Sequence, residues 1–188
     1  MTIRTLAASA SVSVLCLIAA VIPGISGEAA PDQPVPFKLA AVEGAAPNFA
    51  GISNWFNSAP LSMASLRGKV VLVDFWTYGC VNCVNTLPHV TALYAKYKDK
   101  GLVVVGVHTP EFPFERSASN VQAALKRHGI SYPVAQDNES HTWNAYHNQY
   151  WPAQYIIDRS GKIVFQHDGE GQYEQMDRTI QRLLNANS

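Results

Sequence analysis

The chain has 188 residues, 47% of them apolar, and its 14 basic and 14 acidic residues give a formal net charge of zero. This length suits one full domain and is too short for two. The balanced charge, without any run of Lys or Arg, argues against an electrostatic nucleic-acid binder. With three cysteines, of which one lies in the apolar N-terminal run, the chain is not a disulfide-held scaffold.

The N-terminus has the layout of an export signal. Residues 1–4 carry one positive charge, residues 6–22 are apolar, and small residues follow. We therefore expect residues 1–27 to be a cleaved signal peptide or an N-terminal membrane anchor. Residues 28–46 are rich in Pro and Ala and predict a linker, which leaves residues 47–188 as the folded domain. The expected location is periplasmic or otherwise extracytoplasmic, with the apolar run as the anchor if it is retained.

A strand, a turn and two cysteines organise the folded domain. Residues 70–76 are almost all β-branched, aliphatic or aromatic, which predicts a strand that is covered on both faces. The acid Asp74 interrupts this apolar strand, and Gly79 allows a tight turn after it. Cys80 then falls at the predicted start of a helix, with Cys83 one turn further along.

A C-x-x-C pair at the end of a strand is the sequence form of a redox-active dithiol. The unpaired N–H groups and partial positive charge of a helix N-terminus favour a thiolate, so Cys80 is predicted to be the nucleophile. Cys83 is predicted to be the less exposed thiol, which resolves the mixed disulfide that Cys80 forms. Asp74 needs a role or a partner, because burying a lone carboxylate is costly.

The rest of the domain alternates strands and helices. Predicted strands cover residues 102–108, 132–135, 153–157 and 162–167, and predicted helices cover about residues 81–98, 120–128, 141–148 and 170–185. Ser119 or Asn120 is expected to cap the second of these helices. Residues 48–69 predict a small hairpin or two extended pieces. This order of elements predicts an α/β fold with a central mixed sheet flanked by helices.

The segment from Val73 to Cys83 resembles the active-site strand of the thioredoxin-like superfamily. The match includes Asp74, six residues before Cys80, and Pro88, five residues after the second cysteine. The resemblance implies a thioredoxin-like fold around the dithiol.

The remainder of the chain is similar to the exported TlpA-like, or redoxin, branch of that superfamily. It has the extra N-terminal segment of that branch and an inserted strand and helix between residues 102 and 135. Residues 108–112 and 133–137 look especially like the soluble thioredoxin-like domain of DipZ-type proteins. The resemblance covers roughly residues 47–184.

The resemblance implies roles for two acids. Asp74 corresponds to the proton acceptor for Cys83, and a structural hydrogen bond is the alternative interpretation. Glu111 follows a predicted strand end, at the edge of the sheet where sites form. TlpA-like proteins often carry an acid near the dithiol that helps proton transfer, and a solvated loop acid is the alternative for Glu111.

The resemblance also implies a substrate-binding surface. Pro152, just before a predicted strand, falls where the family has a cis-proline loop that faces Cys80 and binds the substrate backbone. Trp76 and Tyr78 are candidates for shaping the surface around the nucleophile. Trp151 is a candidate for lining the same groove, with a place in the core as its alternative.

No metal or other cofactor is expected. A zinc site would need a second ligand pair, and no other cysteine lies in the folded domain. Haem attachment would need a His directly after Cys83, where Val84 stands, and the six histidines show no ligand spacing. Val81 and Asn82 between the cysteines differ from the Gly-Pro of thioredoxin, so the direction of electron flow stays open.

The leading hypothesis is an extracytoplasmic thiol–disulfide oxidoreductase that acts on protein thiols and disulfides, in cytochrome c maturation or in protein disulfide reduction. A reductant outside the cytosol has no glutathione pool to draw on, so a membrane thiol–disulfide electron donor is the expected partner.

Two alternatives stay open. Thr77 and Cys80 match the T-x-x-C motif of a peroxiredoxin-like peroxidase, although Val73 stands where that motif has a proline. The other alternative is a non-catalytic thioredoxin-fold adaptor, or a copper carrier that uses the two thiols and a histidine.

Overall fold

The computed structural model describes residues 44–186. The predicted signal or anchor, residues 1–27, and most of the predicted linker lie outside the described residues. In the part that is described, no helix has the length and apolarity needed to cross a membrane. Ala45, at the end of the predicted linker, already pairs with Lys162, so the described domain begins slightly before residue 47.

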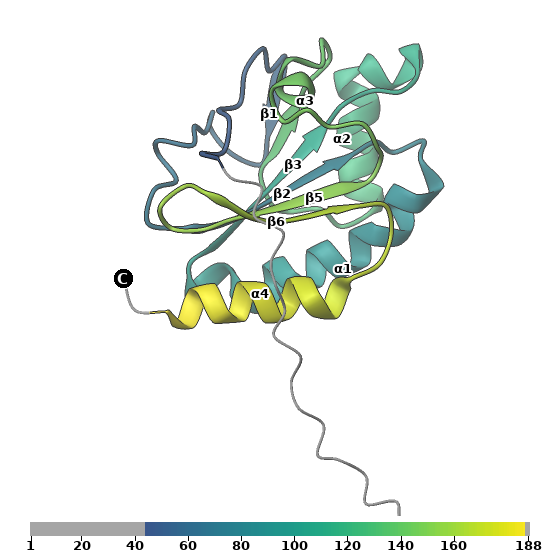
Figure 1. Cartoon of the computed structure of the whole chain (residues 1–188). Helices are drawn as coiled ribbons and strands as arrows, with labels where there is room; N and C mark the ends of the chain where they lie inside the picture. The colour runs from purple at the N-terminus through teal and green to yellow at the C-terminus, as the bar shows by residue number, and fades with distance from the viewer. Residues whose placement is uncertain (1–43, 187–188) are drawn as a thin grey trace, which may run out of the picture. The chain divides into compact units, whose positions relative to one another are not determined.

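A mixed sheet of six strands forms the centre of the described domain (Figure 1). The strands are β1 (Asn54–Phe56), β2 (Val70–Trp76), β3 (Leu102–His108), β4 (Val134–Gln136), β5 (Ala153–Ile157) and β6 (Ile163–Asp168). Their order across the sheet is β1-β4-β3-β2-β5-β6. β3 runs parallel to both β2 and β4, whereas β1, β5 and β6 pair in antiparallel fashion. β2, the strand that leads to the cysteines, therefore lies between β3 and β5.

Helices cover both faces of the sheet. The α-helices are α1 (Val81–Tyr97), α2 (Ala118–Arg127), α3 (His141–Ala145) and α4 (Tyr173–Asn185), and two 3-10 turns are η1 (Lys98–Lys100) and η2 (Pro113–Arg116). α1, α2 and α4 contribute buried residues to one core cluster, whereas α3 and the segment before β2 contribute to the other. Figure 1 shows α1 and α4 side by side below the sheet.

The alternation of side chains along β2 supplies both cores. All seven residues of this strand are buried. Val70, Leu72 and Trp76 belong to the core under α1, α2 and α4, whereas the odd-numbered residues from 71 to 75 belong to the opposite core. Since strand side chains alternate, Asp74 shares the face of Leu72 and Trp76. The buried acid therefore lies on the face that α1 and its Cys83 cover.

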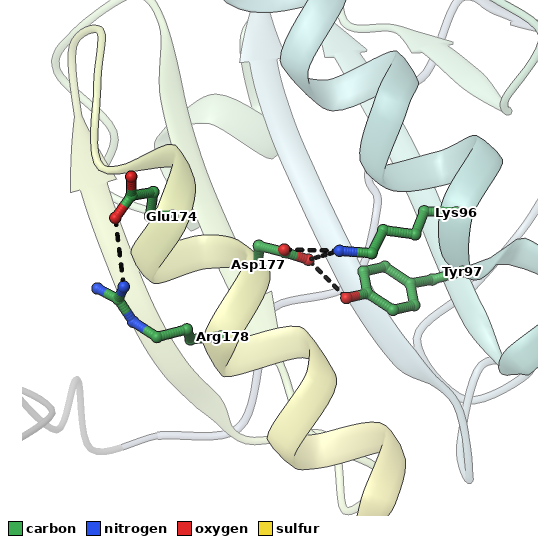
Figure 2. Close-up of polar contacts among 5 residues, drawn as sticks. All are labelled: Lys96, Tyr97, Glu174, Asp177 and Arg178. Atoms are coloured by element: carbon green, nitrogen blue, oxygen red, sulfur yellow. Dashed lines mark hydrogen bonds and ion pairs between the residues drawn. The ribbon is translucent and has the colours of Figure 1, made fainter.

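A polar contact joins the last turn of α1 to α4 (Figure 2). One carboxylate oxygen of Asp177 lies 2.7 Å from Nζ of Lys96, and the other accepts a hydrogen bond from the hydroxyl of Tyr97 at 2.6 Å. Figure 2 also shows Glu174 and Arg178, an exposed pair within α4 at 3.3 Å. The Asp177 contact holds α4 against the helix that the cysteines begin.

Three predictions about local structure are wrong. Of the two alternatives for residues 48–69, the hairpin is wrong, because the strand β1 pairs with β4. Hydrogen bonds between Ser62 and Ser65 close a turn further along the segment. Ser117, rather than Ser119 or Asn120, caps α2, since Ser117 is extended and accepts the N–H of residue 120. The last helix begins at Tyr173 instead of residue 170, because Gly169 and Gly171 have positive φ.

Candidate active site

The two cysteines differ in burial as the sequence predicts. Cys80 is the N-cap of α1, with an extended backbone, and its sulfur accepts the backbone N–H of Cys83 at 3.3 Å. Cys80 is half-buried, whereas Cys83 is completely buried, and both are free thiols. Burial raises the pKa of the Cys83 thiol far above its usual range, and the neighbouring Cys80 adds to this increase. Cys83 therefore needs a base before it can act as a nucleophile.

Asp74 is the candidate for the base that Cys83 needs. It is 1% exposed, and one of its carboxylate oxygens accepts a hydrogen bond from the Gln154 side chain at 3.0 Å. Burial raises its pKa from 3.8 to about 7, although the Gln154 hydrogen bond lowers the pKa in part. Its negative charge also raises the pKa of Cys83, so the two groups interact. A carboxyl group that titrates near neutral pH is suited to accept a proton from a thiol.

The loop before β5 lies against the nucleophile. The peptide bond between Trp151 and Pro152 is cis, as the resemblance implies. The thiol of Cys80 lies 3.9 Å from the carbonyl oxygen of Trp151. The Trp151 ring is half-buried, donates its indole N–H to the carbonyl of Thr109 at 3.1 Å, and packs on Trp143. Trp151 thus belongs partly to the core and partly to the site, while Pro152 is buried.

The predicted role of Trp76 at the surface is wrong. Trp76 is completely buried in the core under α1, and its ring meets the edge of His108. Its position in β2 places its ring on the face of the sheet that α1 covers, so it cannot touch a substrate. Tyr78 is half-buried, and its hydroxyl donates to the carbonyl oxygen of Phe114 at 2.9 Å. Tyr78 therefore remains a candidate for the surface near Cys80.

The structure brings a different acid from Glu111 to the cysteine turn. The Glu111 side chain is exposed, and only its backbone N–H makes a hydrogen bond to a buried group. That N–H donates to Glu115, a completely buried carboxylate that the sequence interpretation missed. The other carboxylate oxygen of Glu115 accepts the N–H of Gly79, the residue before Cys80, at 2.9 Å. The available signal was Pro113 followed two residues later by an acid, as in the first turn of a helix.

A buried histidine lies beneath the same turn. His108, at the end of β3, is completely buried, and its Nε2 is 3.3 Å from the hydroxyl of Thr77. Tyr78 stacks on its ring. Burial lowers the pKa of His108 to about 4, so the ring is neutral at physiological pH. Among the described residues there is no group of three or more His, Cys, Asp or Glu side chains that could hold a metal ion.

Solved structures identify the class of this fold. The thioredoxin-like superfamily protein SPOA0173 matches with a TM-score of 0.71 and 27% sequence identity, covering 77% of this chain and 98% of that chain. The fold is therefore thioredoxin-like, and the relatives and solved structures that are named thiol–disulfide oxidoreductases or interchange proteins support the enzyme class. This confirms the predicted fold and enzyme class.

Within that class, the profile of the AhpC/TSA family matches residues 42–166, and the chain belongs to this family. Protein DipZ of Mycobacterium bovis is 48% identical over 145 residues, which cover 76% of this chain and 21% of DipZ. The chain thus spans about a fifth of the length of that relative. The thiol-disulfide oxidoreductase YkuV of Bacillus subtilis is 28% identical, covering 73% of this chain and 93% of YkuV. The predicted resemblance to DipZ-type proteins is confirmed.

Proposed function

We propose that the protein exchanges electrons with the disulfides of exported proteins through Cys80 and Cys83. The observation that carries the proposal is the unequal burial of the two sulfurs, since Cys80 is half-buried at the helix N-cap and Cys83 is completely buried one turn behind it. A substrate sulfur reaches Cys80 first, and Cys83 meets only the mixed disulfide. This order is the one that dithiol–disulfide exchange requires.

The proposed reaction has two displacement steps. The Cys80 sulfur attacks one sulfur of a substrate disulfide, so that a mixed disulfide forms and the other substrate sulfur leaves as a thiol after taking up a proton. Asp74 then accepts the proton of Cys83, whose raised pKa otherwise keeps it neutral. The Cys83 thiolate attacks the Cys80 sulfur, which leaves a disulfide between the two cysteines and releases the second substrate sulfur as a thiolate that then takes up a proton.

A partner must return the two electrons after each turnover. For an extracytoplasmic protein, which the N-terminal sequence predicts, a membrane thiol–disulfide carrier is the proposed donor. Oxidised cysteine pairs of apocytochrome c, which must be reduced before haem is attached, are the proposed substrate class within protein disulfide reduction. The printed name of YkuV, a thiol-disulfide oxidoreductase, supports the chemistry of exchange.

The experiment that tests the proposal traps the first intermediate. In a Cys83→Ala variant, the mixed disulfide on Cys80 has no resolving thiol, so we expect it to accumulate with insulin and with exported proteins. A Cys80→Ala variant is the matched control and should trap nothing. Equal trapping by both variants, or a wild-type protein that cannot reduce insulin, would contradict the proposal.

The peroxidase alternative has less support from the site. The hydroxyl of Thr77, which would be the threonine of the T-x-x-C motif, is buried and lies against His108. It is therefore engaged away from a peroxide bound at Cys80. Reduced protein should consume disulfides and leave hydrogen peroxide nearly untouched, and peroxide consumption that survives Cys83→Ser would favour the alternative instead.

A further inference from the structure

Glu115 is a completely buried carboxylate to which the proposed reaction assigns no role. Among the ion pairs of the described residues none includes it. Its two oxygens instead accept three backbone N–H groups, from Gly79 at 2.9 Å, Glu111 at 2.7 Å and Phe112 at 2.9 Å. Burying a carboxylate is costly, and here backbone donors alone offset that cost.

These three donors come from two separate segments. Gly79 belongs to the turn between β2 and α1 and immediately precedes Cys80, whereas Glu111 and Phe112 belong to the loop after β3. The carboxylate therefore bridges the turn that carries the nucleophile to a neighbouring loop. The hydroxyl of Tyr78, which donates to the carbonyl of Phe114, is a second tie between the same two segments.

Gly79 and Glu115 fit one another closely. A Cβ added at Gly79 would collide with Oε1 of Glu115. The φ of Gly79 lies outside the left-handed region, so its backbone conformation alone does not demand glycine. The contact with the carboxylate is thus the physical reason for a residue without a side chain immediately before Cys80.

We propose that Glu115 is a positioning residue of the dithiol site, which holds the turn before Cys80 so that its sulfur meets a substrate disulfide in line. Displacement at sulfur depends strongly on the approach of the nucleophile, and small misplacements slow such reactions severely. The proposal rests on the function proposed above, because it concerns the attack by Cys80. It assigns Glu115 no proton transfer and no contact with substrate.

The charge and shape of the side chain both matter to this role. Three N–H donors share two carboxylate oxygens, and glutamine offers only one oxygen. In Glu115→Gln, the amide NH₂ group therefore faces either the N–H of Gly79 or the pair from the loop. A donor that faces a donor in a buried site breaks one side of the bridge.

The test measures attack by Cys80 alone. In a Cys83→Ala background, the rate of mixed-disulfide formation with glutathione disulfide is followed by mass spectrometry, and its final amplitude reports the fraction of folded, reactive protein. We expect Glu115→Gln to lower the rate constant at least about tenfold at full amplitude. When the protein with both cysteines reduces insulin, Glu115→Gln should lower kcat and leave KM unchanged.

Glu139→Gln, which removes an exposed acid paired with Arg116, is the matched control and should react like its parent.

The outcomes separate this proposal from the proposed function. If the parent protein forms no mixed disulfide, the proposed function fails. If the parent reacts and folded Glu115→Gln reacts equally fast, the positioning role is overturned. Should Glu115→Gln fail to fold, Gly79→Ala tests the same bridge from its other side, because the new Cβ displaces the carboxylate oxygen. Slow attack supports the proposal, and attack at the parental rate overturns it.

Discussion

At the scale of single residues, Asp74 links the chemistry of the site to the stability of the protein. Burial raises its pKa to about 7 in the folded protein, from a reference value of 3.8. The unfolded chain therefore loses this proton at a lower pH than the folded protein does. As the pH rises between these two values, ionisation increasingly favours the unfolded state, so the folded protein is progressively destabilised.

We expect Asp74→Asn to remove this cost. A difference of about three pKa units corresponds to a free-energy difference on the order of 4 kcal/mol, so the reduced variant should be more stable than the reduced wild type by a few kcal/mol above about pH 7. Near pH 4 the two stabilities should converge. Urea unfolding across this pH range measures the effect.

The same variant also reports on the proposed proton transfer. Release of substrate from the mixed disulfide should slow on the order of a hundredfold in Asp74→Asn, because Cys83 has lost its base. In wild type this step should speed up as the pH rises through about 7, where Asp74 ionises. Parallel stability curves, or an unchanged rate of release, would contradict the assignment.

The sequence could predict those site residues whose roles are local. Cys80, Cys83 and Asp74 lie in one strand and turn, and their spacing alone indicates the chemistry. The role of Glu115 could not be predicted from the sequence, because its partner Gly79 is 36 positions away along the chain. Only the folded loop after β3 brings the two residues together. The place of Trp76 does not follow from its nearness to the cysteines, because strand alternation puts its ring on the face of β2 that α1 covers.

At the scale of secondary-structure elements, the contact between α1 and α4 depends on one acid. Burial alone would raise the pKa of Asp177, but its hydrogen bonds with Lys96 and Tyr97 outweigh this and lower the pKa. Tyr97 is 3% exposed, and the carboxylate of Asp177 is the acceptor of its hydroxyl, so removal of Asp177 takes away a charged hydrogen-bond acceptor. Glu174 and Arg178 on α4 are both exposed, so water solvates either side chain when its partner is removed.

We therefore expect Asp177→Ala to lower the free energy of unfolding by about 1–2 kcal/mol, because the Tyr97 hydroxyl loses its charged acceptor. Arg178→Ala on the same helix, which breaks an exposed pair, should cost about 0.5 kcal/mol or less. Urea unfolding of both variants makes the comparison. Equal effects would show that the Asp177 contact, drawn in Figure 2, holds the helices no better than a surface pair does.

Elements with strong periodicity were predictable from sequence, and elements defined by distant partners were not. The strand before Cys80 is buried on both faces and matches its predicted bounds, as does the strand from residue 102 to 108. β1 has three residues and exists only because β4 offers it a partner 78 or more positions further along the chain. The start of α4 depends on glycine φ values that periodicity does not encode.

At the scale of the whole described domain, the segment before β2 completes the sheet and one core. β1 covers the outer edge of β4, and the amide of Asn57 donates to the carbonyl oxygens of Ile130 and Tyr132. Phe49, 8% exposed, meets Trp55 edge-on with ring centroids 5.5 Å apart. Without this segment, β4 becomes an exposed sheet edge and the core under α3 is opened.

Two fragments test how much of the chain the fold requires. A fragment of residues 44–188 retains every described contact of the sheet and serves as the reference. A fragment of residues 58–188 lacks β1 and the rings of Phe49, Trp55 and Phe56, so it should be less stable than the longer fragment by more than about 3 kcal/mol, since burial of one such ring contributes that much. Phe49→Ala in the longer fragment should cost about 3 kcal/mol and separates the effect of the ring from that of the strand. If the shorter fragment proved equally stable, β1 would contribute nothing to the stability of the sheet, and the prediction would be wrong.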